Sequence, residues 1–206
     1  MLFSKAVLSL VFFAISSSAS PIDERQTSCS ALELVFLAGT NEEGLGLAGG
    51  PLSTDLASAV SGTTTYSVPY DTRAEYGSTV TAGATMTVDY ITAQAARCPS
   101  QRFALGGYSK GAMVIHSMNL SSALKSKVDA IVVFGDPYRG INNNWPINSP
   151  ALNSNPRSGF TSSQNVASFC NSGDIVCRGG LSVPAHLTYG EDGSTDVAAS
   201  FIKNHA

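Results

Sequence analysis

The sequence predicts an α/β fold of three layers, in which a mostly parallel central sheet lies between helices. Short segments that are apolar throughout alternate with longer segments whose apolar residues recur at helical spacing. Strands that are apolar at every position are buried on both faces, which is typical of a parallel sheet covered by helices. The 206 residues suit one such domain, and the sequence contains neither internal repeats nor a domain linker.

The first strand is expected over 32–37, where an apolar run ends before Gly39. A glycine-rich loop should then continue to Pro51. Ser53 is a suitable N-cap for a helix that runs to about Val60. The β-branched segment 63–68 predicts the second strand.

A long helix is expected over 78–97, where apolar side chains return at helical spacing until Pro99 ends the element. A short strand should follow over 102–105, stopped by two glycines. The remaining expected elements are a helix over 110–120, a shorter helical piece to 127, a strand over 128–134, an irregular region over 138–165, a last strand over 166–169 and a helix capped by Ser194 that ends near 204.

Composition excludes several classes of function. Only 13% of the residues are charged, about half the roughly 25% of an average soluble protein. The net charge is −3 and no basic block occurs, which argues against binding to nucleic acid or to an anionic membrane surface. Hydrophobic residues make up 43%, so the chain is neither disordered nor a membrane bundle.

The N-terminus has the pattern of a secretory signal peptide. Lys5 precedes an apolar run over 6–15, and small residues follow over 16–20. That run is too short for a membrane anchor, which needs about 18 apolar residues. We therefore expect residues 1–19 to be a cleaved signal peptide, 20–28 a short N-terminal segment or pro-segment, and 29–206 a single extracellular domain.

The four cysteines, Cys29, Cys98, Cys170 and Cys177, are an even number in an oxidising compartment. Three pairings are possible. The simplest joins Cys170 to Cys177 and Cys29 to Cys98. No C-x2-C spacing occurs, so a zinc site is not expected.

The chemistry is predicted by Gly107-Tyr108-Ser109-Lys110-Gly111, a G-x-S-x-G motif. By itself the motif is weak evidence, but here it follows a predicted strand and opens a predicted helix. That is the context of a nucleophile elbow, in which Ser109 would be exposed on a tight turn between the two glycines. The alternative is a glycine-rich turn with an inert serine.

A serine nucleophile needs a base, and the base needs an orienting acid. Of the three histidines, His116 lies in the helix after the elbow and cannot fold back to it, and His205 is the penultimate residue. His186 lies in a predicted loop after the last strand and is the expected base. Asp136 and Asp174 both follow strands and both satisfy the order nucleophile, acid, base. Asp174 is preferred because it lies shortly before His186, between Cys170 and Cys177.

These motifs resemble the fungal cutinase family, which are small secreted serine esterases with a lidless α/β-hydrolase fold. The resemblance runs from about Cys29 to the C-terminus. It rests on the elbow, on the pair Cys170 and Cys177 enclosing Asp174, and on the segment 181–187 around His186. It implies the catalytic residues Ser109, Asp174 and His186.

The resemblance also implies an oxyanion hole made of the backbone N–H groups of Lys110 and Thr40, either with or without the Thr40 hydroxyl. Thr40 stands where relatives usually have Ser. Lys110 stands where many have Gln, which predicts an added cation at the rim of the site, and Ala38 stands where many have Arg. The segment before His186 is a residue shorter than in well-known relatives. Leu181, Val183 and Leu187 flank His186, either as an apolar substrate rim or as packing of the segment.

The expected function is hydrolysis of cutin, other aliphatic polyesters or short to medium acyl esters, by a monomer without metal or organic cofactor. An acetylxylan esterase of the same family is the main alternative. A serine protease fits the elbow and the residue order less well. An inactive secreted surface-binding protein is the alternative from another class.

Overall fold

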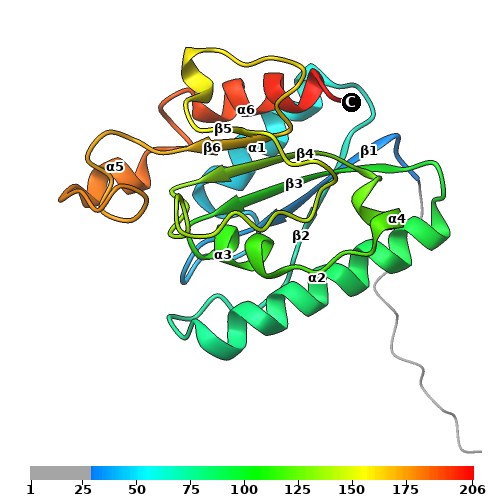
Figure 1. Cartoon of the computed structure of the whole chain (residues 1–206), viewed down its shortest axis with the longest axis horizontal. Coiled ribbons are helices and arrows are strands. Elements are labelled where there is room, and N and C mark those ends of the chain that lie inside the picture. The colour runs from blue at the N-terminus through cyan, green and yellow to red at the C-terminus, as the bar shows by residue number, and fades with distance from the viewer. Residues whose placement is uncertain (1–28) are drawn as a thin grey trace, which may run out of the picture.

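The computed structural model describes residues 29–206, so the predicted signal peptide and the segment 20–28 lie outside the described residues (Figure 1). One sheet of six strands has the order β2-β1-β3-β4-β6-β5, and each neighbouring pair is parallel. The strands are β1 (Leu32–Leu37), β2 (Thr64–Ser67), β3 (Arg102–Tyr108), β4 (Val128–Phe134), β5 (Leu152–Asn153) and β6 (Val166–Phe169). The helices are α1 (Gly46–Ala59), α2 (Gly77–Arg97), α3 (Lys110–Ser117), α4 (Ser122–Lys125), α5 (Val183–Leu187), α6 (Ser194–Lys203) and the short 3₁₀ helix η1 (Pro156–Ser158).

The helices cover both faces of the sheet, as the sequence predicts. In Figure 1, α1 and α6 lie on one side of the strands and α2 and α3 lie on the other. Successive residues of β1 serve the two faces in turn: Leu34 and Phe36 join the core under α1 and α6, and Val35 and Leu37 join the core under α2 and α3. Each of these four side chains is fully buried, which contributes about 1.5–3 kcal/mol per large apolar side chain. The three-layer α/β prediction is confirmed.

The parallel arrangement brings functional segments together. The loop after β1, the turn after β3, the end of β4 and the loop after β6 all leave the sheet at the carboxyl ends of their strands. Ligand sites of open α/β sheets lie at this edge. In Figure 1, α5 lies beyond the same edge.

Helix α1 begins earlier than predicted. The sequence indicated a loop as far as Pro51 and an N-cap at Ser53, but α1 begins at Gly46 and contains Pro51. The Glu42 carboxylate explains the early start, because it accepts the backbone N–H of Leu47 at 3.0 Å in the first turn. This carboxylate satisfies a donor that a helix N-terminus otherwise leaves free.

Further boundaries also differ from prediction. Strand β3 does not stop at residue 105 but runs through both glycines to Tyr108, and a Cβ at Gly106 would lie 2.6 Å from the Phe36 ring. The region 138–165, expected to be irregular, contains β5 and η1. His186 lies in the short helix α5 rather than in a loop, and the N-cap of α6 is Gly193 rather than Ser194.

Both disulfides have the simplest pairing, Cys29 with Cys98 and Cys170 with Cys177, which confirms that prediction. The first ties the N-terminal end of the described chain to the end of α2. The second closes the loop that follows β6. Within residues 29–206, every helix is too short or too polar to span a bilayer.

Candidate active site

Ser109 occupies a strained turn between β3 and α3. Its φ of 51° and ψ of −114° are a conformation that non-glycine residues rarely adopt, at a cost of about 1–3 kcal/mol. The flanking glycines are required sterically. A Cβ at Gly111 would lie 2.0 Å from the carbonyl oxygen of Leu37, and a Cβ at Gly107 would lie 2.8 Å from the backbone of Gly111. The turn therefore has the geometry of the nucleophile elbow that the motif predicts.

His186 lies beside this serine. Its Nε2 is 3.0 Å from Ser109 Oγ. Helix α5 carries the imidazole, and the Tyr108 hydroxyl donates to the His186 carbonyl at 2.9 Å, which links the helix to the end of β3. Gly135, directly after β4, packs against the ring, where an added Cβ would lie 2.5 Å from Cε1. Residues at the ends of β3 and β4 thus both contact His186.

Asp174 completes a row of three side chains. Its Oδ2 is 2.9 Å from His186 Nδ1 and accepts the Tyr189 hydroxyl at 2.6 Å, while its Oδ1 accepts the N–H of Val176 at 2.6 Å. Burial disfavours the charged form of this carboxylate. The hydrogen bonds from Tyr189, His186 and Val176 outweigh burial, so the pKa of Asp174 is lower than usual. An ionised Asp174 fixes a proton on Nδ1 and leaves the lone pair of Nε2 free to accept the serine proton.

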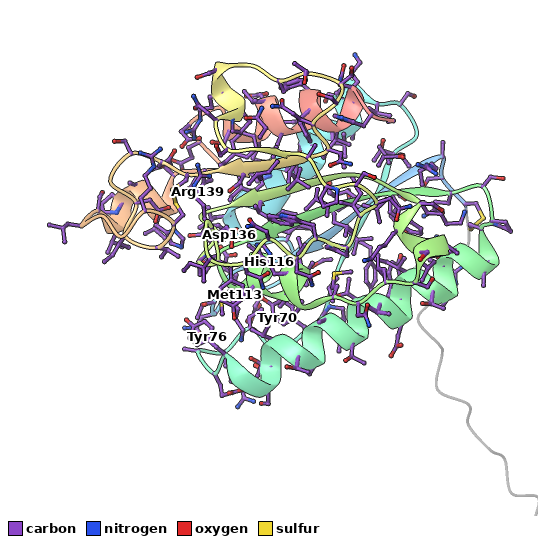
Figure 2. All side chains as sticks on the ribbon, in the orientation of Figure 1. Tyr70, Tyr76, Met113, His116, Asp136 and Arg139 are labelled. Atoms are coloured by element: carbon purple, nitrogen blue, oxygen red, sulfur yellow. A yellow bond between two sulfur atoms is a disulfide. The ribbon has the colours of Figure 1, made fainter. Side chains whose placement is uncertain are left out.

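The other candidate acid belongs to a different pair. Asp136 Oδ2 is 3.0 Å from His116 Nε2, and His116 Nδ1 is 3.0 Å from the carbonyl oxygen of Asn144. Figure 2 labels both members of this pair, which are buried beneath the segment that follows β4. The Trp145 ring lies 4.0 Å from the imidazole. Asp136 therefore anchors a loop and does not contact His186.

The two predicted oxyanion residues belong to different segments, the loop after β1 and the start of α3. Thr40 is half-buried in the loop after β1, and its Oγ1 is 3.2 Å from the hydroxyl of Tyr76. Lys110 begins α3 directly after Ser109. Its side chain was expected to place a cation at the rim, and this expectation is wrong. The side chain is fully buried, because its ammonium donates to the backbone carbonyls of the loop between β2 and α2.

Exposed apolar side chains flank His186 in the sequence. Leu181 is 96% exposed, and Val183 and Leu187 are each 52% exposed. This exposure is compatible with the predicted apolar rim. Ile175, next to Asp174 in the sequence, is also exposed.

Sequence reasoning missed the tyrosines around these residues. Tyr189 is fully buried and donates to the acid, and the partly exposed Tyr76 contacts Thr40. Tyr189 lies three residues after His186, just beyond the end of α5, so its nearness in sequence to the base was the one signal that could have indicated it. For Tyr76 no local pattern exists, because its contact depends on the approach of two loops distant in sequence.

Comparisons with known proteins agree with this geometry. A curated cutinase of Hypocrea jecorina is 33% identical over 183 residues, which cover 84% of this chain and 66% of the relative, so the chain spans just under two thirds of that protein's length. Among solved structures, Trichoderma reesei cutinase in complex with a C11Y4 phosphonate inhibitor is 30% identical with a TM-score of 0.68, covering 84% of this chain and 75% of that one.

A second structure shares the fold. The catalytic core domain of acetyl xylan esterase from Trichoderma reesei has a TM-score of 0.70 at 21% identity, over 87% of this chain and all of that one. The family model named Cutinase matches residues 28–206, which include every residue described above. This protein therefore belongs to the cutinase family.

Proposed function

We propose that this protein is a secreted carboxylic ester hydrolase in which Ser109 is the nucleophile, His186 the general base and Asp174 the orienting acid. The observation that carries the proposal is the continuous row of contacts from Ser109 Oγ through both nitrogens of His186 to Asp174, at 3.0 and 2.9 Å. Membership of the cutinase family supports the same chemistry.

The reaction is acyl transfer in two steps. Ser109 Oγ attacks the ester carbonyl carbon while its proton passes to His186 Nε2. The tetrahedral intermediate collapses, the bond to the alcohol oxygen breaks, and the imidazolium gives its proton to that oxygen. Water then attacks the acyl-enzyme with His186 again as base, which releases the acid and restores Ser109. Asp174, which hydrogen bonding keeps ionised despite its burial, stabilises the imidazolium in both steps.

The developing oxyanion needs donors at the elbow. We assign the backbone N–H groups of Thr40 and Lys110 to this role, because one precedes α1 in the loop after β1 and the other is the first residue of α3, directly after the nucleophile. Each such donor accelerates acyl transfer by about 10²–10³-fold in enzymes that use this device.

The proposed substrates are cutin and other aliphatic polyesters, together with short to medium acyl esters. Support comes from the exposed rim of Leu181, Val183 and Leu187 beside the base. An exposed apolar rim suits contact with an aliphatic chain at a surface. Extracellular location is supported by the two disulfides, which persist in oxidising compartments.

The test is an assay of residues 20–206, produced in an oxidising compartment, with p-nitrophenyl butyrate. The matched control is Ser109→Ala, and circular dichroism checks that both proteins fold. Activity in the parent that disappears in Ser109→Ala supports the proposal. Equal rates in both, or no activity in folded parent, overturns it. Comparing products from cutin with those from acetylated xylan then separates a cutinase from an acetylxylan esterase.

A further inference from the structure

Lys110 carries a buried charge directly beside the proposed nucleophile. Its side chain is fully buried, and its Nζ donates to the carbonyl oxygens of Asp71 at 2.9 Å, Arg73 at 2.5 Å and Glu75 at 3.1 Å. All three acceptors are neutral backbone groups. A buried ammonium is costly unless its donors are satisfied. These carbonyls therefore stabilise the ammonium, and the ammonium in turn fixes the positions of the carbonyls.

The three carbonyls belong to one short loop between β2 and α2, outside regular secondary structure. A carbonyl between them, that of Thr72, instead accepts the N–H of Asn41 at 2.9 Å. The Thr72 hydroxyl also donates to the carbonyl of Glu42 at 2.9 Å. Lys110 therefore fixes the loop 71–75 through three of that loop's carbonyls. The loop that carries Thr40 fixes it through a fourth, the carbonyl of Thr72.

Two tyrosines connect the Lys110 ammonium to the loop that carries Thr40. Nζ lies 5.5 Å from the ring centroids of both Tyr70 and Tyr76, which Figure 2 labels near each other. The Tyr70 hydroxyl donates to the Ala38 carbonyl at 2.6 Å, and the Tyr76 hydroxyl is 3.2 Å from Thr40 Oγ1. Each ring thus has the cation near its face and a residue of the Thr40 loop at its hydroxyl.

We propose that the Lys110 side chain is the positioning residue of the oxyanion hole: its buried ammonium fixes the loop 71–75 and Tyr76, and through them the position of Thr40. This inference rests on the proposed ester hydrolase function. Lys110 thereby has two separate roles. Its backbone N–H is one proposed oxyanion donor, and its side chain fixes the position of Thr40, which carries the other. The sequence places the side chain within one residue of Ser109, but only the fold reveals which loop it holds.

Lys127 provides a matched control. Its Nζ also donates to backbone carbonyls, those of Pro99 and Gln101, but at the start of β3, the opposite end of the sheet from Ser109. Removing either ammonium takes a donor from backbone carbonyls, but Lys127 is half-buried whereas Lys110 is fully buried. Only the loss of Lys110 should affect the transition state.

The experiment measures kcat and KM for p-nitrophenyl butyrate in Lys110→Met, Lys127→Met and Tyr76→Phe, with thermal unfolding to establish that each is folded at the assay temperature. We expect Lys110→Met to lower kcat about 10–100-fold, with KM changed less than about threefold, because the lost interaction matters most in the transition state. Lys127→Met should retain kcat within about twofold. Lys110→Arg, which keeps the charge, should recover part of the loss.

The double variant Lys110→Met/Tyr76→Phe tests the connection itself. If Lys110 acts through Tyr76, the effects on kcat are not additive and the double variant resembles Lys110→Met. Additive effects, or kcat in Lys110→Met within twofold of the parent, overturn the inference. If Lys110→Met does not fold, Tyr76→Phe alone decides: kcat within twofold overturns the inference and a loss of about tenfold supports it. An inactive parent instead overturns the ester hydrolase function, so the two failures are distinct.

Discussion

Two aspartates in this fold each lie about 3 Å from a histidine, and single-residue geometry separates their roles. Asp174 contacts His186, whose other nitrogen contacts Ser109 Oγ. Asp136 contacts His116, whose other nitrogen contacts a backbone carbonyl. Both nitrogens of His116 thus face protein oxygen atoms, so neither nitrogen is available to a substrate or nucleophile.

These aspartates give a matched pair of substitutions. Asp174→Asn should lower kcat by about 10³–10⁴-fold while leaving the protein folded, because the imidazole loses the carboxylate that sets its tautomer. Asp136→Asn should retain kcat within a few-fold but lower the free energy of unfolding by about 1–3 kcal/mol, because it perturbs a buried hydrogen bond to His116. Kinetics and urea denaturation of both variants check this. A larger loss of kcat in Asp136→Asn would contradict the assignment of the acid.

Glu33 makes stability depend on pH. This carboxylate is fully buried in β1, where it accepts the Tyr90 hydroxyl at 2.8 Å and the Gln101 amide at 2.7 Å. Burial raises the pKa of Glu33, and those hydrogen bonds and the charge of Arg97 only partly oppose the shift. The folded state therefore favours the protonated form. The stabilising contribution of Glu33 is complete below its unfolded pKa and is lost as pH rises through the folded pKa.

Glu33→Gln removes this titration. We expect the stability of the variant relative to the parent to increase as pH rises from about 4 towards 7, which is checked by urea denaturation across that window. A difference between variant and parent that does not change with pH would contradict the shift.

At the scale of elements, the close approach of α3 to the end of β1 maintains the tight turn at Ser109. Gly111→Ala would place a methyl group 2.0 Å from the Leu37 carbonyl oxygen and force α3 away from the strand. We expect this change to destabilise the protein by about 3 kcal/mol or more and to abolish activity. Gly50→Ala, in α1 with open space around the new methyl group, should instead stabilise by about 0.5–1 kcal/mol. Thermal unfolding compares the two, and equal effects would contradict the steric account.

Local pattern predicted some elements well and others poorly, for physical reasons. The bounds of β4 and β6 agree with prediction because each is a mostly apolar run between turn residues. The start of α1 depends on the Glu42 side chain. Strand β5 has two residues and exists only through its pairing with β6. Its residues carry no periodicity of their own to recognise.

In the candidate active site, too, some features could be predicted from the sequence and others could not. The motif and the order of residues were enough to predict that Ser109, Asp174 and His186 act together, and the structure places them in contact. The environment of Lys110 could not be predicted, because its acceptors are backbone carbonyls of residues 71–75. Every residue has a backbone carbonyl, so the sequence does not show which carbonyls accept a hydrogen bond from Lys110.

At the scale of the whole molecule, the two disulfides should serve different purposes. Replacing Cys29 and Cys98 with Ser opens a connection with a sequence separation of 69, and replacing Cys170 and Cys177 opens one of 7. Chain entropy predicts losses in stability of about 4.5 and about 2.5 kcal/mol respectively. Replacing Cys170 and Cys177 should lower kcat more, because the backbone N–H groups of Val176 and Cys177 donate to the Asp174 carboxylate. Denaturation and kinetics of both variants test this, and a greater kcat loss from the first would contradict it.

The central claim is that Ser109 is an activated nucleophile, and covalent labelling tests it most directly. The folded protein is incubated with a p-nitrophenyl alkyl phosphonate, and intact mass and peptide mapping locate any adduct. The account predicts one phosphonyl group per molecule, bound to Ser109, and no labelling in Ser109→Ala. The absence of an adduct in folded parent, or an undiminished adduct in Ser109→Ala, would contradict it.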